Sequence, residues 1–340
     1  MVRRRDAFDF VAMRARRHET LECGRTRRWA CAIATAHLFG ICSKHRRGFG
    51  DSSLASRRDR TIQCDLAGTT RSMRCLLVAD LHYSLQQYDW VTEVAGDFDV
   101  VVIAGDHLDL SSMVDFRAQS VVVRKYIAKL TAKTQLLVCS GNHDLDTRDE
   151  TGEKVSRWIL GARDCGVPCD GDSFVFSDTL FTVCPWWDGP TVRGAIEALL
   201  AADAKKRPRR WIWVHHAPPA SSATSWDGVR HHGDADLRRW ILQYRPDFVL
   251  CGHVHQSPFR QGGSWADCVG PTWVFNAGHQ FGRPPAHVIL DCEQQRALWF
   301  SAAGNQIVRL DRALRRPIEK LIELPGWLAV KGPDLDPSPA

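Results

Sequence analysis

The sequence has no apolar run that reaches the roughly 18–20 residues needed for a membrane-spanning helix. It also has no Cys-x-x-Cys pair, which argues against a zinc ribbon or a thioredoxin-like redox site. Twelve cysteines in 340 residues fall far below the density of a small disulfide scaffold, so we interpret them as buried thiols of a reducing, cytoplasmic compartment. Because 44% of the residues are hydrophobic and 25% are charged, the composition predicts a packed globular core and excludes wholesale disorder.

Positive charge is concentrated in the first fifth of the chain. Residues 1–72 contain 16 basic and 7 acidic residues, whereas residues 73–340 contain 29 basic and 32 acidic residues. The main part of the chain is therefore slightly acidic, which argues against a nucleic-acid-coating surface there. Nucleic-acid binding through the Arg-rich start is a separate hypothesis, with a salt-sensitive affinity that deletion of residues 1–72 should abolish.

Three interpretations of residues 1–72 compete. They could form a targeting segment, because Thr26-Arg27-Arg28-Trp29 faintly resembles a twin-arginine signal; residues 1–45 would then direct export. They could form a nucleic-acid-binding arm. We favour a disordered or untranslated extension with an internal start at Met73, which leads directly into an apolar strand. The expected organisation is this extension over 1–72, a main globular domain over 73–305, and a C-terminal helix and tail over 306–340.

Short apolar runs recur after Met73, and five of them end in a polar cluster. These runs are Cys75–Ala79, Val100–Ala104, Leu136–Ser140, Trp211–Val214 and Phe248–Cys251. Continuous apolar runs of this length are typical of strands that are covered on both faces. Helical stretches at 114–133, 191–205 and 235–244 alternate with them, which predicts an α/β domain with parallel strands in its first half.

Later strand-like runs follow, with little helix between the last three of them. They are Phe174–Phe176, Leu180–Cys184, Thr272–Asn276, His287–Asp291 and Ala297–Ser301, and they predict a second sheet with more antiparallel character. The fold class that follows is α/β: a four-layer α/β/β/α sandwich of two facing mixed sheets flanked by helices.

The polar clusters at the strand ends consist of metal-ligand residue types. In open sheets ligands bind beyond the carboxyl ends of strands, and here five such ends carry Asp, His or Asn. Carboxylate, imidazole and amide donors suit Mn, Fe, Zn or Ni better than a thiolate-bound metal. About seven candidate ligands are too many for one tetrahedral zinc ion, so the sequence predicts two divalent metal ions.

Taken in order, the clusters resemble the signature of the calcineurin-like metallophosphoesterase superfamily. They read Asp80-Leu81-His82, Gly105-Asp106-His107-Leu108-Asp109, Gly141-Asn142-His143-Asp144, His215 and Gly252-His253-Val254-His255. Each motif is short, but five in order over residues 73–300, each at a strand end, form a specific match. Sequence differences from the Ser/Thr protein phosphatases and the purple acid phosphatases favour the broad bacterial-type branch of phosphodiesterases and phosphatases.

The resemblance implies a role for each motif residue. One metal would be bound by Asp80, His82 and His255, and the other by Asn142, His215 and His253. Asp106 would bridge both ions, and a hydroxide between them would attack phosphorus. His143 would act beside the leaving group as a general acid or charge stabiliser, and Asp109 would orient it.

Two neighbouring histidines compete for one ligand position. His215 directly follows the strand 211–214, so we predict it as the ligand, whereas His216 is kept as a pocket residue that binds substrate phosphate. His107 occupies a variable motif position and is expected to face solvent. Trp186 and Trp187 fall in a predicted loop, where they would anchor the loop or stack on a substrate ring.

The predicted function is hydrolysis of a phosphodiester or a small phosphomonoester. The alternatives are a phosphomonoesterase or nucleotidase, and a non-catalytic scaffold of the same fold.

Overall fold

A computed structural model describes residues 73–206, 209–324 and 326. The predictions for residues 1–72, including the start at Met73, concern a segment that lies outside the described residues. Among the described residues, no helix combines the length and the apolar character needed to cross a bilayer.

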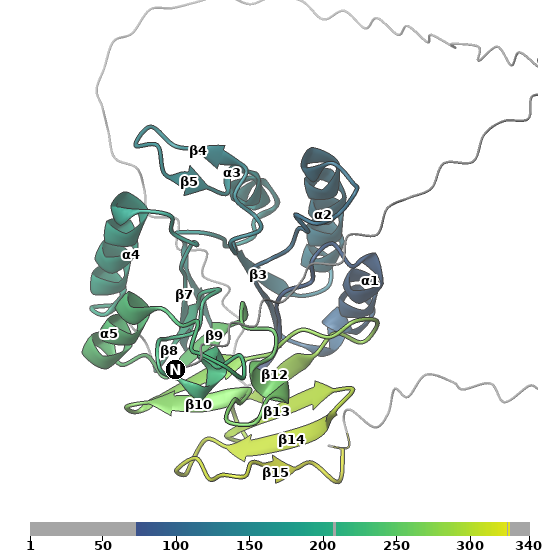
Figure 1. Cartoon of the computed structure of the whole chain (residues 1–340), viewed down its shortest axis with the longest axis vertical. Helices are drawn as coiled ribbons and strands as arrows, with labels where there is room; N and C mark the ends of the chain where they lie inside the picture. Colours follow the sequence, from purple (N-terminus) through teal and green to yellow (C-terminus); the bar gives the residue numbers. More distant parts are fainter. Residues whose placement is uncertain (1–72, 207–208, 325, 327–340) are drawn as a thin grey trace, which may run out of the picture. The chain divides into compact units, whose positions relative to one another are not determined.

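Two mixed β-sheets form the centre of the fold (Figure 1). The first has seven strands in the order β15-β14-β13-β12-β1-β2-β3. Its strands are β1 Arg74–Val78, β2 Val100–Ala104, β3 Gln135–Cys139, β12 His287–Asp291, β13 Arg296–Ser301, β14 Gly304–Arg309 and β15 Glu319–Lys320. Strands β1, β2 and β3 are parallel, and antiparallel pairing begins between β1 and β12.

The second sheet has six strands in the order β10-β11-β9-β8-β7-β6. They are β6 Ser173–Phe176, β7 Thr179–Val183, β8 Arg210–Val214, β9 Phe248–Cys251, β10 Ala266–Val269 and β11 Thr272–Asn276. The four inner strands are parallel, and β6 and β10 pair antiparallel at the two edges. A short hairpin of β4 Thr147–Arg148 and β5 Lys154–Val155 lies outside both sheets.

Helices cover the outer faces of the two sheets. Helices α1 Leu85–Val94, α2 Phe116–Thr131 and α3 Arg157–Leu160 accompany the first sheet, and α4 Pro190–Asp203 and α5 Ala235–Tyr244 accompany the second (Figure 1). Two helices start at an aspartate cap: Asp115 accepts from two amides of α2, and Asp234 accepts from the Leu237 amide of α5. Such caps satisfy amides that have no partner within the helix.

Side-chain alternation along the strands builds the layers. In β1, Cys75 and Leu77 point into the core between the two sheets, whereas Leu76 and Val78 pack under the helices of the first sheet. In β8, Ile212 enters the same central core. Because successive strand side chains face opposite sides, a continuous apolar run fits a strand that is buried on both faces. The predicted fold of two mixed sheets flanked by helices is confirmed.

Two details of the predicted organisation are wrong. The runs 287–291 and 297–301 were expected in the second sheet, but they form β12 and β13 of the first sheet, where β12 pairs with β1 and β13 pairs with β12. The sheet also continues past residue 305, because β14 pairs with β13 as far as Arg309. Residues 306–324 contain strand and turn, so the expected C-terminal helix does not lie within them; residues 325 and 327–340 lie outside the described residues.

Candidate metal centre

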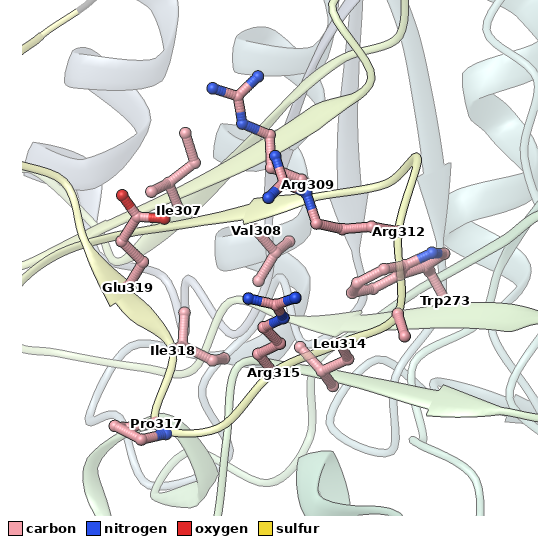
Figure 2. Close-up of a pocket in the computed structure, with 11 residues that line it drawn as sticks. Trp273, Ile307, Val308, Arg309, Arg312, Leu314, Arg315, Pro317, Ile318 and Glu319 are labelled. Atoms are coloured by element: carbon pink, nitrogen blue, oxygen red, sulfur yellow. The ribbon is translucent and has the colours of Figure 1, made fainter.

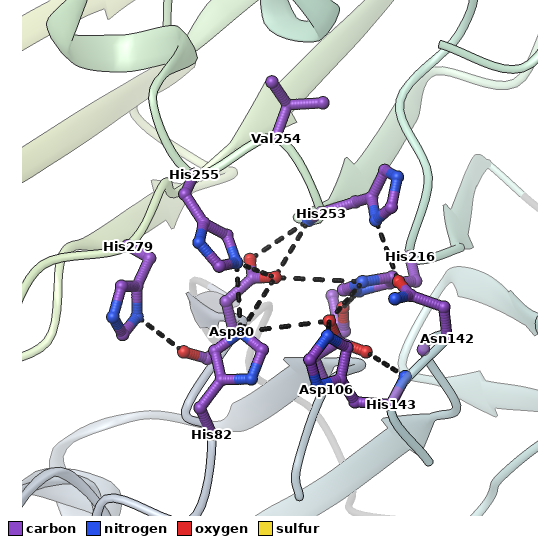
Figure 3. Close-up of polar contacts among 12 residues, drawn as sticks. Asp80, His82, Asp106, Asn142, His143, His216, His253, Val254, His255 and His279 are labelled. Carbon is purple, nitrogen blue, oxygen red and sulfur yellow. Dashed lines mark hydrogen bonds and ion pairs between the residues drawn. The ribbon is translucent and has the colours of Figure 1, made fainter. Parts of the chain in front are cut away.

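The carboxyl ends of β1, β2, β3, β8 and β9 bring together the predicted site residues other than His215 (Figure 3). The loop after β1 is hydrogen-bonded to the loop after β2, because the Asp80 amide donates to the Gly105 carbonyl at 3.0 Å and the His82 amide to the Asp106 carbonyl at 3.0 Å. The loop after β3 joins them, since the His143 amide donates to Asp106 Oδ1 at 2.9 Å. Each loop therefore holds the next in place.

The backbone at the centre is strained at several candidate ligands. Asp80, His82, Asp106 and His253 have φ values of 56°, 42°, 52° and 69°, in the left-handed region that non-glycine residues rarely occupy. Such conformations cost on the order of 1–3 kcal/mol each and persist where the surroundings fix them, most often at functional sites.

Motif glycines allow the close approach of the carboxylates. A Cβ at Gly141 would collide with the Asp106 carboxylate, and a Cβ at Gly252 would collide with that of Asp80. The His253 amide next to Gly252 donates to both Asp80 carboxylate oxygens at 3.1 Å. These glycines thus belong to the motif because the carboxylates pack directly against the backbone there.

One ligand cluster contains Asp80, His82, Asp106 and His255. The Nε2 atoms of His82 and His255 are 3.0 Å apart, and His255 Nε2 is 3.2 Å from Asp80 Oδ1. Burial lowers the pKa of His255, but the adjacent Asp80 carboxylate outweighs it and raises the pKa above its ordinary value. Nitrogen lone pairs and carboxylate oxygens that face one point are a suitable donor set for a divalent cation.

A second cluster contains Asp106, His216 and His253. Nδ1 of His216 donates to the Ala104 carbonyl at 2.7 Å, which directs Nε2 towards Asp106 Oδ2 at 3.2 Å. This Nε2 is buried and has no hydrogen-bond partner among the described residues. A histidine that donates one ring N–H to a carbonyl and leaves the other nitrogen unpaired has the arrangement of a metal ligand.

Asn142 lies beside the second cluster, with its Oδ1 2.9 Å from His253 Nδ1 (Figure 3). Burial, followed by the neighbouring His216, lowers the pKa of His253 to about 4, which keeps its ring neutral. Neutral imidazole is the form that binds a metal.

The structure places His216 at this cluster in the position that the sequence prediction assigned to His215. The His215 ring stacks on Trp187 at 4.6 Å instead, and burial lowers its pKa to about 3. His216, which was predicted to bind substrate phosphate, is completely buried, and its Nε2 lies 3.2 Å from Asp106 Oδ2. Both residues follow the same strand, and successive residues point to opposite sides.

His143 lies at the exposed rim of the centre. Its Nε2 is 3.9 Å from Asp106 Oδ2, and its side chain is 26% exposed. His82, Asp109 and His143 have nitrogen and oxygen atoms within 4.8 Å of one another, so the structure brings Asp109 near His143. A hydrogen bond that would orient His143 is not formed among the described residues: its Nδ1 is unpaired, and Asp109 Oδ1 accepts from the Ser111 amide.

Several residues outside the predicted catalytic and metal-binding set also shape the centre. Asp144, from the same motif as Asn142, accepts backbone N–H groups of the loops after β2 and β3. His279 Nδ1 donates to the Asp80 carbonyl at 2.7 Å. Trp186, whose placement in a loop was predicted, lies 5.1 Å from the His253 ring. The signal available in the sequence for His279 was its position directly after Asn276-Ala277-Gly278 at the end of an apolar run.

The centre is separate from a cavity of about 180 Å³ between β11 and the β14–β15 region (Figure 2). Trp273, Val308 and Leu314 form its apolar part, with Arg309 and Arg315 among its charged lining residues. None of the predicted site residues lines this cavity.

A family model described as calcineurin-like phosphoesterase matches residues 73–257, which contain every residue of both ligand clusters. The chain belongs to the calcineurin-like phosphoesterase family. Membership confirms the resemblance seen in the sequence and assigns the chain to the metal-dependent phosphoester hydrolases. Together with the His and Asp clusters, it indicates binding of divalent metal ions.

This calcineurin-like phosphoesterase is similar to solved structures at low identity. The protein TT1561 of Thermus thermophilus is 12% identical with a TM-score of 0.46, over 71% of this chain and 100% of that one. The phosphoesterase Yfce from E. coli is 15% identical with a TM-score of 0.33, over 70% and 94%. The purple acid phosphatase PPD1 of yellow lupin (Lupinus luteus) is 15% identical with a TM-score of 0.43, over 72% and 52%. No curated protein sequence matches the chain.

Proposed function

We propose that this chain hydrolyses a phosphodiester, or a small phosphomonoester, with two divalent metal ions drawn from Mn, Fe, Zn and Ni. The observation that carries the proposal is that the buried Asp106 carboxylate belongs to both ligand clusters. One carboxylate shared between two neighbouring sets of donors is the arrangement that a two-metal centre requires.

The donor sets are proposed as follows. One ion would be held by Asp80, His82 and His255, and the second by Asn142, His216 and His253, with Asp106 common to both. The unpaired Nε2 of His216 supports this assignment. This buried nitrogen faces the Asp106 carboxylate, and either a cation or a proton between the two would satisfy both groups. In the absence of a cation the proton is favoured: burial lowers the pKa of His216, but Asp106 and Asp80 raise it to about 9.

When bound, two divalent cations lower the pKa of water towards neutrality and neutralise charge on the phosphoryl oxygens. His143 would transfer a proton to the departing ester oxygen, since its ring is accessible from solvent and its Nε2 points towards Asp106. Asp109, whose carboxylate lies within 4.8 Å of ring nitrogens of His82 and His143, would hold the His143 ring in place once substrate is bound. In enzymes without bound substrate, the hydrogen bonds of catalytic groups are often long, and they shorten only in the substrate complex.

The complete donor set supports an enzyme over a non-catalytic scaffold, which would have lost ligands. A purified-protein assay tests this directly. The full chain, reconstituted with Mn²⁺, should hydrolyse both bis(p-nitrophenyl) phosphate and p-nitrophenyl phosphate, with the diester hydrolysed faster. Chelation should abolish both activities, and returning Mn²⁺ should restore them.

Other outcomes of this assay have defined meanings. Faster hydrolysis of the monoester would overturn the diester preference and support the phosphomonoesterase alternative. Hydrolysis of neither ester with Mn²⁺, Fe²⁺, Zn²⁺ or Ni²⁺, by protein shown to bind metal, would overturn the catalytic proposal and support the scaffold.

A further inference from the structure

Phe281 presents an aromatic ring to solvent beside the metal centre. It is 94% exposed, and its ring centroid lies 5.4 Å from that of His279. The His279 ring is in turn 4.9 Å from His255 and 5.4 Å from His82. A continuous series of rings thus leads from two proposed metal ligands to the surface.

The loop that carries Phe281 is fixed to the centre on one side. The His279 amide donates to the His255 carbonyl at 3.2 Å, and its Nδ1 donates to the Asp80 carbonyl at 2.7 Å (Figure 3). Since Nδ1 carries the proton in this hydrogen bond, Nε2 of the neutral ring is left as an acceptor.

A buried amide fixes the same loop from helix α1. Gln87, which is 1% exposed, donates from Nε2 to the carbonyls of Gln280 and Gly282, each at 2.7 Å. These two carbonyls flank Phe281 directly. The Gln280 side chain forms a further hydrogen bond that holds the loop, because its Oε1 accepts from the Ala302 amide at 2.8 Å.

An exposed ring on a fixed loop contributes almost nothing to folding by burial, since its apolar surface stays in water. It does favour binding, because a rigid aromatic side chain gives contact area at a low cost in conformational entropy. We propose that Phe281 is a substrate-binding residue that stacks on an aromatic group of the phosphoester. Where this group is a nucleobase, one of its N–H groups would donate to His279 Nε2. The substrate class is an aryl or nucleobase-bearing phosphoester. This inference rests on the proposed function of the neighbouring centre.

Two phosphonates that cannot be hydrolysed test the inference by binding alone. The full chain loaded with Mn²⁺ is titrated calorimetrically with phenylphosphonate and with methylphosphonate, which differ only in the aromatic ring. The wild-type protein should bind the phenyl compound roughly three- to tenfold more tightly, the range expected for one aromatic pair. Phe281→Ala should reduce this ratio to about one, and Phe281→Tyr should retain it.

Ile322→Ala provides the control, because Ile322 is another exposed apolar side chain, 92% exposed, and lies beside β15. It should leave the ratio unchanged. Equal affinity of the wild type for both phosphonates, or a preference that survives Phe281→Ala, would overturn the inference. If the wild type hydrolyses the nitrophenyl esters and yet shows no preference, only this inference fails. If it neither binds a phosphonate nor hydrolyses an ester, the proposed function fails as well.

Discussion

At the scale of single residues, Asp106 is where the two ligand clusters meet. Burial alone would raise the pKa of Asp106, but the neighbouring His216 and His143 lower it below its ordinary value, so the carboxylate stays ionised. An ionised carboxylate that is buried requires cationic partners, because an unpaired buried charge is costly. Metal ions would supply that charge.

Asp106→Asn removes this charge while keeping the shape of the side chain. We expect the variant to lose both metal ions and to fall in activity by about 100-fold or more. Mutation of a residue that is only hydrogen-bonded to a metal ligand already lowers metal affinity or activity by roughly 10- to 100-fold. Metal content by mass spectrometry, with circular dichroism as the control for folding, measures the outcome. A folded variant that still holds two ions would contradict the bridging role.

His215 and His216 can be separated by a matched pair of alanine variants. His216→Ala should retain fewer metal ions than wild type because its Nε2 faces Asp106 at 3.2 Å. His215→Ala should retain all of them but unfold at a lower temperature, because it loses the ring that stacks on Trp187. Metal content and thermal melting of both variants provide the test, and the reverse result would restore the original sequence prediction.

His143→Ala should keep its metal ions and slow turnover by roughly 10²–10⁴-fold, the usual contribution of a general acid. The loss should be larger for substrates with poor leaving groups, which depend more on protonation. A series of aryl phosphoesters with different leaving-group pKa values measures this dependence. An equal loss across the series would show that His143 does not protonate the leaving group.

At the scale of elements, the loops after β2 and β3 are connected by Asp144. Its carboxylate accepts from the amides of His107 at 3.0 Å, Leu108 at 3.1 Å and Gly141 at 2.8 Å. These loops carry Asp106 and Asn142 into the centre. Asp144 therefore acts through the backbone rather than as a ligand.

Asp144→Ala should lower the free energy of unfolding by about 2–4 kcal/mol, because several buried amides lose their acceptor and each such loss costs roughly 1–3 kcal/mol. Asp144→Asn keeps one carbonyl acceptor and should cost less. Urea denaturation of the two variants against wild type measures the difference. Equal stability of Asp144→Ala and wild type would show that the loops do not depend on this carboxylate.

Elements were predicted well where their signal is local. The parallel strands 100–104 and 248–251 and the helix 235–244 lie as the apolar runs indicated. The sheet to which β12 and β13 belong was predicted wrongly, because strand pairing depends on segments about two hundred residues apart and an apolar run does not encode its partner. His107 was expected to face solvent, but it is completely buried and its Nε2 donates to the Cys139 carbonyl.

At the scale of the whole molecule, buried histidines link stability to pH. His287 is packed between the rings of Trp90 and Phe300 at 4.6 and 5.1 Å, and its Nδ1 donates to the Pro285 carbonyl. Burial lowers the pKa of His287 to about 4 from an ordinary value of 6.5. The unfolded chain therefore binds a proton more readily than the folded protein between these values, and stability falls as the pH decreases from 6.5 towards 4.

His287→Gln removes this titration and keeps a donor for the Pro285 carbonyl. Whatever its stability at pH 7, the variant should lose about 2 kcal/mol less than wild type between pH 7 and pH 5. Urea denaturation of both proteins at the two pH values measures the difference. The same loss in both would show that His287 does not contribute to acid sensitivity.

The sequence by itself determined the α/β class, the strand ends that carry the polar clusters and the family, because apolar runs, their polar ends and their order are local features of the chain. Only the tertiary structure decided that His216 rather than His215 faces Asp106, that β12 joins the first sheet, and that Phe281 lies beside the centre. Each of these depends on the direction of a side chain or on contact between distant segments. Packing fixes such relations only after the chain has folded.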